Sequence, residues 1–148
     1  MIRSWLSGKL FIVLFLLVQL LAPLPANALL VTGMDDIWFF EVACKHQQVQ
    51  FFNANGSLLA TARSGKLYAA NGALEGEIRD CLRIYSSSGA LLATRNSDGR
   101  YYLANGSLLG RIEPDGRVVN ADGSPEGRVN GQYFLGANGS IKVRFKVE

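Results

Sequence analysis

Turn-forming dipeptides recur along this chain at a nearly constant interval, and this repeat limits the choice of fold more than any other feature. A first turn series steps by 16, 17, 17, 17 and 16 residues: Asn55-Gly56, Asn71-Gly72, Ser88-Gly89, Asn105-Gly106, Asp122-Gly123 and Asn138-Gly139. A second turn series lies between them: Ser64-Gly65, Asp98-Gly99, Asp115-Gly116 and Asn130-Gly131. Asn-Gly and Asp-Gly favour type I′ hairpin turns, whose two central residues have positive φ. Reversals this close together leave room for short strands and not for helices.

Similar residues stand at even distances from each glycine of the first turn series. Four residues before it the chain is apolar or aromatic: Phe52, Tyr68, Tyr85, Tyr102, Val119 and Leu135. Four residues after it the side chain is small in five of the six units: Ala60, Gly76, Ala93, Gly110, Gly127 and, as the exception, Val143. Even spacing in an extended chain places residues on one face. We therefore predict an all-β domain of antiparallel hairpins, with the aromatic column packed in the core.

The small column also predicts how the hairpins are arranged. Small residues weaken a strand unless another part of the chain approaches closely, so we expect the hairpins to crowd around a pseudo-rotational axis. A linear β-meander or β-solenoid is the alternative. Two units depart from the pattern: Arg95 breaks an apolar column in the third, and Pro125 cannot donate a ladder hydrogen bond in the fifth.

A second apolar column lies one position earlier in each unit, out of phase with the predicted core. Its members are Phe51, Leu67, Ile84, Tyr101, Val118 and Phe134. Such residues either accommodate a β-bulge or form an exposed apolar patch that contacts a partner. We take Tyr101, Phe134 and Phe51 as the candidate binding surface.

The segment Tyr102-Leu-Ala-Asn-Gly-Ser-Leu-Leu-Gly-Arg-Ile-Glu-Pro-Asp-Gly116 resembles the bacterial β-flower proteins. The resemblance covers about residues 49–148 and departs from the pattern in the third and fifth units and in residues 29–48. It implies four or five hairpins around a pseudo-rotational axis, and it is compatible with export. The family has no established activity, so the resemblance implies a fold and not a chemistry.

The part of the chain before the repeats differs from them in composition. The run Ile37–Cys44 predicts a buried strand that pairs with a neighbouring unit and closes the ring. Cys44 and Cys81 are the two cysteines of the chain. In an oxidising compartment an even pair predicts a disulfide, here closing a loop of about 37 residues worth about 4 kcal/mol. Two buried thiols or a metal pair are the alternatives.

The N-terminus predicts export. Residues 1–28 combine two cations, an apolar run and a small-residue site ending at Ala28, as a cleaved signal peptide does; an uncleaved membrane anchor is the alternative. Residues 29–148 then form a single domain, periplasmic or secreted. Because Arg3 and Lys9 lie in the leader, the remaining domain has 13 Lys+Arg against 12 Asp+Glu. This near-neutral balance favours neither nucleic acid nor, after signal cleavage, a membrane as partner.

Chemistry-bearing motifs are scarce. His46 is the only histidine, no Gly-x-Ser-x-Gly nucleophile motif occurs, and the carboxylate pair Glu75 and Glu77 is typical of a solvated face. We predict no catalytic residue, no metal ligand and no cofactor. The sequence favours a non-enzymatic exported module that binds a protein or glycan at the cell envelope. A structural, self-assembling envelope protein, with homo-oligomers, is the alternative.

Overall fold

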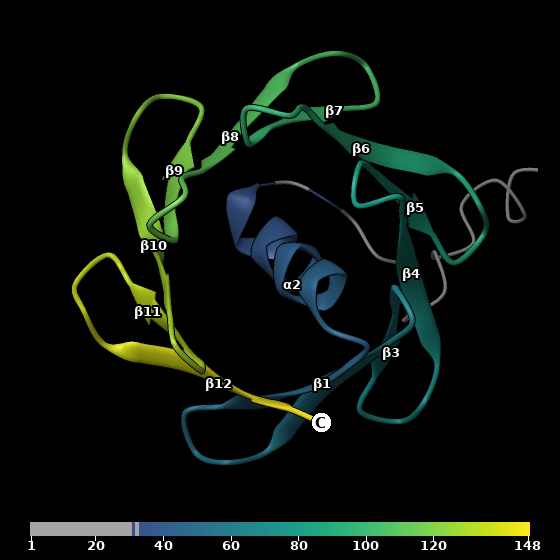
Figure 1. The fold of residues 1–148 in the computed structure, drawn as a ribbon, viewed down its shortest axis with the longest axis vertical. Helices are drawn as coiled ribbons and strands as arrows, with labels where there is room; N and C mark the ends of the chain where they lie inside the picture. Colours follow the sequence, from purple (N-terminus) through teal and green to yellow (C-terminus); the bar gives the residue numbers. More distant parts are fainter. Residues whose placement is uncertain (1–30, 32) are drawn as a thin grey trace, which may run out of the picture.

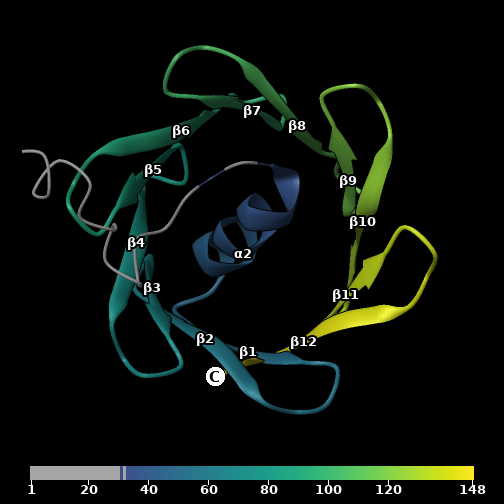
Figure 2. The same ribbon diagram turned by 180° about the vertical axis from the view of Figure 1, so that it is seen from behind.

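The computed structural model describes residue 31 and residues 33–148, so the predicted signal peptide lies outside the described residues. A helix, α2 (Met34–Lys45), precedes twelve strands that close into a barrel with α2 in its centre (Figures 1 and 2). The strands are β1 (Gln48–Asn53), β2 (Leu58–Arg63), β3 (Lys66–Ala69), β4 (Leu74–Arg79), β5 (Arg83–Ser86), β6 (Leu91–Arg95), β7 (Arg100–Leu103), β8 (Leu108–Ile112), β9 (Arg117–Asn120), β10 (Pro125–Asn130), β11 (Tyr133–Gly136) and β12 (Ile141–Val147).

The strand order confirms the predicted rotational arrangement of hairpins. Each strand pairs antiparallel with its neighbours in sequence, and β12 pairs with β1 to close the ring. The six hairpins of the first turn series surround α2 (Figure 1). This number exceeds the four or five that the resemblance implies, and membership of that family stays a prediction.

The turns of the repeat do not all have the same backbone geometry. In the first turn of the first series, Gly56 N donates to Asn53 O at 3.0 Å, and Gly56 has φ +90°. Asn55 is not among the described residues with positive φ, so the turn is type I followed by a glycine bulge and not the predicted type I′. In the second series, Ser64 and Gly65 both have positive φ, at +51° and +78°, as type I′ requires. At Asp98-Gly99 and Asp115-Gly116 only the glycine has positive φ, so these turns resemble the first series.

A β-bulge in each first-series hairpin reverses the predicted faces. In the first hairpin Phe51 pairs with Ala60 and Phe52 with Leu58, so the register shifts by one residue; equivalent shifts occur in the other five hairpins. The out-of-phase column therefore points inward: Phe51 and Tyr101 are fully buried and Phe134 is 5% exposed. Our prediction of an exposed binding surface at these three residues is wrong, and the bulge alternative is confirmed.

The reversal also corrects the predicted aromatic core. Phe52, Tyr68, Tyr85 and Tyr102 are half-exposed and face away from α2, because they neighbour the inward residues along the strand. The small column faces inward opposite the large out-of-phase column, as in the pairs Phe51–Ala60 and Tyr101–Gly110. At Gly110 a Cβ would lie 2.5 Å from Met34 Cγ, so the small residues admit both the large partner and the helix.

The run Ile37–Cys44 is part of helix α2, so the predicted strand is wrong, and the ring is closed by β1 and β12 instead. Asp35 and Asp36 stand in the first turn and Lys45 in the last, the charge order that the helix dipole favours. The helix is apolar on nearly every side because strands surround it. Cys44 at its C-terminal end forms the predicted disulfide with Cys81.

Residues 31 and 33–148 contain no helix of the length and apolarity that crossing a membrane requires.

Candidate functional site

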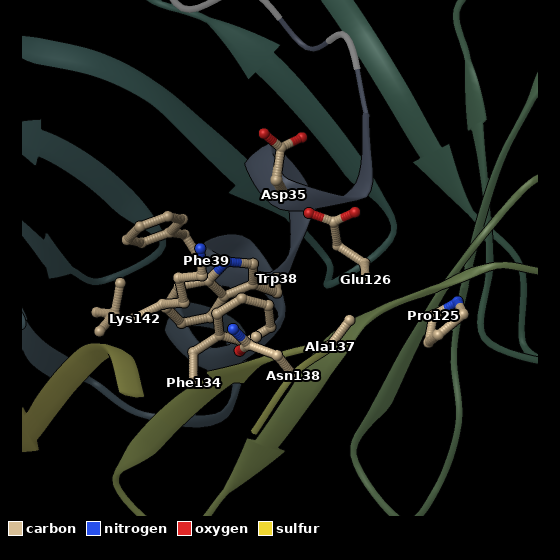
Figure 3. A pocket seen from close by; sticks show the side chains of 11 residues that line it. Asp35, Trp38, Phe39, Pro125, Glu126, Phe134, Ala137, Asn138 and Lys142 are labelled. Carbon is tan, nitrogen blue, oxygen red and sulfur yellow. The ribbon is translucent and has the colours of Figure 1, made fainter. Parts of the chain in front are cut away.

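A pocket of about 590 Å³ opens where the N-terminal half of α2 meets β10, β11 and β12 (Figure 3). We call it the aromatic pocket. Its lining comprises Asp35, Trp38, Phe39, Pro125, Glu126, Phe134, Gly136, Ala137, Asn138, Lys142 and Val143. This volume is within the range of small-molecule binding sites.

Three aromatic rings form the floor of the pocket. Trp38 of α2 stacks on Phe134 of β11 with ring centroids 4.3 Å apart and planes 6° from parallel. Phe39 stacks on the same indole at 4.0 Å. Trp38 is almost fully buried, so its position is fixed by the core. The floor of the pocket is therefore part of the packed core.

Carboxylates stand on one side of this floor. Asp35 of α2 and Glu126 of β10 project into the same region (Figure 3). The pKa of Asp35 is raised, first by burial and then by the negative charges of Asp36 and Glu126. Glu126 accepts a hydrogen bond from Asn120 Nδ2 at 3.1 Å. The pocket thus presents acceptor groups whose mutual repulsion a donor-rich ligand would relieve.

Donors come from the last hairpin. Lys142 lies on β12, and Asn138 lies in the β11–β12 turn. Asn138 Oδ1 accepts hydrogen bonds from Ser140 N at 3.0 Å and from Ser140 Oγ at 2.7 Å. This leaves the amide NH₂ group as the remaining donor of Asn138. Aromatic floor, acceptors and donors therefore surround one space.

The irregular fifth unit explains why the pocket opens here. Gly127 and Val129 are half-buried, whereas their counterparts in the fourth unit, Gly110 and Ile112, are buried against α2. Pro125 at the start of β10 donates no hydrogen bond to β9. The barrel wall consequently packs less closely on the helix at this point. The departure from the repeat at Pro125, which was evident in the sequence, is thus adjacent to the pocket.

The other departure from the repeat, Arg95, has a partner in the helix. Arg95 Nε lies 3.1 Å from Glu41 Oε2, a charge contact without the alignment of a hydrogen bond. Lys45 Nζ lies 3.5 Å from Glu41 Oε1, and the Tyr101 hydroxyl donates to Glu41 Oε2. Burial raises the pKa of Tyr101, and the charge of Glu41 adds to the effect. This network joins α2 to β6 and β7.

The predicted site residues are thus divided between core and pocket. Phe134 forms part of the floor of the aromatic pocket, whereas Phe51 and Tyr101 lie in the core. His46 lines a smaller cavity of about 260 Å³ at the other end of α2. Sequence reasoning missed Trp38 and Phe39 because they fell in a run assigned to a strand, and it missed Asp35 because this residue stands just before that run. The two acids before that run were the available helix signal.

Within the described region, no group of three or more His, Cys, Asp or Glu side chains is placed to hold a metal ion. A scan against protein-family models, a search of curated proteins and a search of solved structures gave no match to this chain. The site is therefore interpreted from its own residues.

Proposed function

We propose that this protein is a non-enzymatic module, exported to the periplasm or beyond, that binds a glycan of the cell envelope in the aromatic pocket. The observation that carries the proposal is the grouping of Asp35, Glu126 and Lys142 around one pocket whose lining includes the half-buried ring of Phe39. It favours the glycan over a protein as the partner.

The chemistry of a sugar ring suits these groups. A pyranose has one face of C–H groups, which packs on an aromatic surface, and a rim of hydroxyls. Hydroxyls donate to the carboxylates of Asp35 and Glu126 and accept from the ammonium of Lys142. A few placed polar groups over an apolar floor is the usual composition of a small-ligand site.

The proposal of binding without catalysis rests on the surroundings of the two carboxylates. The charge of Glu126 contributes to the raised pKa of Asp35, but His46, the only histidine of the chain, lines a cavity at the opposite end of α2. We assign both carboxylates as hydrogen-bond acceptors. Release of shorter sugars from any bound glycan would contradict this assignment.

The test is a glycan array that includes peptidoglycan fragments, followed by calorimetry on each ligand found. The protein is purified from an exporting host with its cysteines oxidised, and mass spectrometry of its N-terminus tests cleavage after Ala28. We expect saturable binding that Glu126→Gln weakens at least tenfold, about 1.4 kcal/mol. Glu75→Gln is the matched control, because Glu75 occupies the same repeat position in the second unit. Equal binding by both variants would remove the pocket from the proposal.

Self-assembly is the second candidate function, and the outer surface favours it. In four of the six bulged hairpins, an exposed aliphatic residue pairs across the bulge with a half-exposed aromatic or aliphatic one. These pairs, which we call the outer belt, are Tyr68–Leu74, Tyr85–Leu91, Tyr102–Leu108 and Leu135–Ile141. Leu108 is 42% and Ile141 50% exposed. Repeated apolar pairs are typical of a surface that contacts copies of itself.

Sedimentation velocity distinguishes this candidate from binding. Oligomers that Leu108→Ser dissociates, together with no glycan binding by folded protein, would replace the first proposal. A monomer over the whole concentration range would eliminate the second.

A further inference from the structure

The last strand carries a row of cations without acidic partners. Lys142, Arg144 and Lys146, which we call the β12 row, are exposed and alternate with the buried Val143 and Phe145. Arg144 and Lys146 lie on the outer face of the barrel, and Lys142, the extra residue of the β11–β12 bulge, continues the row to the rim of the aromatic pocket. None of the three forms an ion pair within the part of the chain that the structure describes.

Cations of the two preceding units behave differently. Arg111 and Arg117 contact Glu113, and Arg117 and Arg128 contact Asp115. These contacts neutralise the outer face of β8, β9 and β10. The acid nearest in sequence to the β12 row is Glu148, which accepts a hydrogen bond from Gln48 Nε2 at 2.6 Å. The charge of the β12 row is thus uncompensated.

The β12 row lies beside aromatic side chains and a groove. Arg144 pairs across the sheet with Phe52 of β1 and with Tyr133 of β11, which is 41% exposed. A groove of about 580 Å³ runs along Arg144 and Lys146 and includes Phe52 and Gln132. At the other end of the row Lys142 reaches the aromatic pocket. Cations, aromatic surface and groove are therefore continuous along one strand.

We propose that the β12 row binds a linear acidic polysaccharide, one that carries carboxylate, sulfate or phosphate groups along its chain. Alternate residues of a strand are about 7 Å apart, so the three cations are spread along about 14 Å of β12. A line of this length matches successive charges of an extended polymer and not a single small anion, which needs converging donors. Phe52 and Tyr133 provide surfaces for the C–H faces of the sugars. The choice of a polysaccharide over a nucleic acid rests on export, which is part of the proposed function.

The experiment compares two triple variants of the full mature protein. K142Q/R144Q/K146Q removes the β12 row, and R111Q/R117Q/R128Q removes three cations that already have acidic partners. Each variant is checked for a wild-type circular-dichroism spectrum and an intact disulfide. The probes are polygalacturonate, which has one carboxylate per sugar, and the same polymer with its carboxylates methyl-esterified.

We expect wild type and R111Q/R117Q/R128Q to bind polygalacturonate equally at low salt, and K142Q/R144Q/K146Q to bind at least tenfold more weakly. Added salt should reduce the difference, because exposed charge contacts are screened. The esterified polymer should bind all three proteins weakly. Equal losses in both triple variants would show a general charge effect and overturn the proposal.

Two further probes test the class of partner. Stronger binding to vesicles containing anionic lipid, or to single-stranded RNA, than to polygalacturonate would replace the polysaccharide by that partner. Glu126→Gln separates this proposal from the function proposed for the aromatic pocket. If Glu126→Gln weakens the binding of a neutral ligand to the pocket and leaves the binding of polygalacturonate unchanged, the two surfaces act independently. If K142Q/R144Q/K146Q has no effect while Glu126→Gln does, only the β12 row is refuted.

Discussion

Replacing Arg95 by isoleucine tests whether the buried charge network holds α2 in place. The counterparts of Arg95 in the second and fourth units are Ile78 and Ile112, so isoleucine suits the wall of the barrel. The replacement leaves the carboxylate of Glu41, a residue only 7% exposed, without its closest cation. We therefore expect a loss of stability despite a better match to the repeat.

The magnitude follows from the burial of the partners. Removing one member of a fully buried ion pair costs about 3–5 kcal/mol. Here the Arg95 side chain is 25% exposed and Lys45 remains 3.5 Å from Glu41, which places the cost near the lower limit. Burial of the isoleucine offsets about 1 kcal/mol. The net loss is about 2 kcal/mol, which in a domain of this size lowers Tm by about 8 °C.

A double-mutant cycle separates the charge pair from general damage. Glu41→Leu alone leaves Arg95 and the Tyr101 hydroxyl unpartnered and should cost about 3 kcal/mol. In Glu41→Leu/Arg95→Ile only the hydroxyl lacks its partner, so the loss should fall to about 1 kcal/mol. Urea unfolding at neutral pH, followed by circular dichroism, measures all three variants. Losses that simply add, or an Arg95→Ile variant as stable as wild type, would refute the network as the device that positions the helix.

Three other expectations concern the core and the pocket. Burial, and then the charge of Glu41, raise the pKa of Tyr101, so the folded state holds this proton more tightly than the unfolded chain. The free energy of unfolding should therefore be full below about pH 10 and fall as the pH rises further. In urea titrations, Tyr101→Phe should lose less stability than wild type between pH 9 and pH 11. Asp35→Asn should raise Tm at pH 7, where the carboxylate is ionised against its raised pKa, and the gain over wild type should shrink at pH 3. The same variant should bind the pocket ligand less well in calorimetry, the opposite change to that in stability. Gly110→Ala should cost at least 2 kcal/mol more than Gly123→Ala in urea unfolding. Both glycines have positive φ, but only at Gly110 would the new Cβ clash with Val119 O and Met34.

The repeat predicted the ring because turn chemistry is local. A dipeptide such as Asn105-Gly106 sets a reversal by its own backbone preferences. The phase of the strands was not predictable in the same way. A bulge adds one residue after the turn, so counting by twos from Gly106 assigned Tyr102 to the core and Tyr101 to the surface, whereas the structure has the opposite. The only sign of the extra residue in the sequence was the second apolar column, which includes Tyr101 and is one position out of phase with the first.

The helix was missed for a different reason. A run such as Ile37–Cys44 that is apolar on every side fits a buried strand or a buried helix equally, since periodicity is absent. Its neighbours Asp36 and Lys45 indicate the helix only through weak terminal preferences. The aromatic pocket in turn depends on Trp38 meeting Phe134, residues far apart in sequence. That contact exists only once the helix occupies the centre of the closed ring, so no local signal predicts it.

The pairing of β1 with β12 has a consequence for how the molecule forms. Every other strand pair joins neighbours in sequence, but Val49 faces Val147 across the seam. Local hairpins form quickly, whereas a contact between the two ends of the repeat region waits for the whole chain. The helix leaves the ribosome first and the sealing strand last. A chain interrupted before Ile141 therefore lacks the strand that closes the ring around α2, and would present its apolar interior to solvent and to any chaperone that receives it.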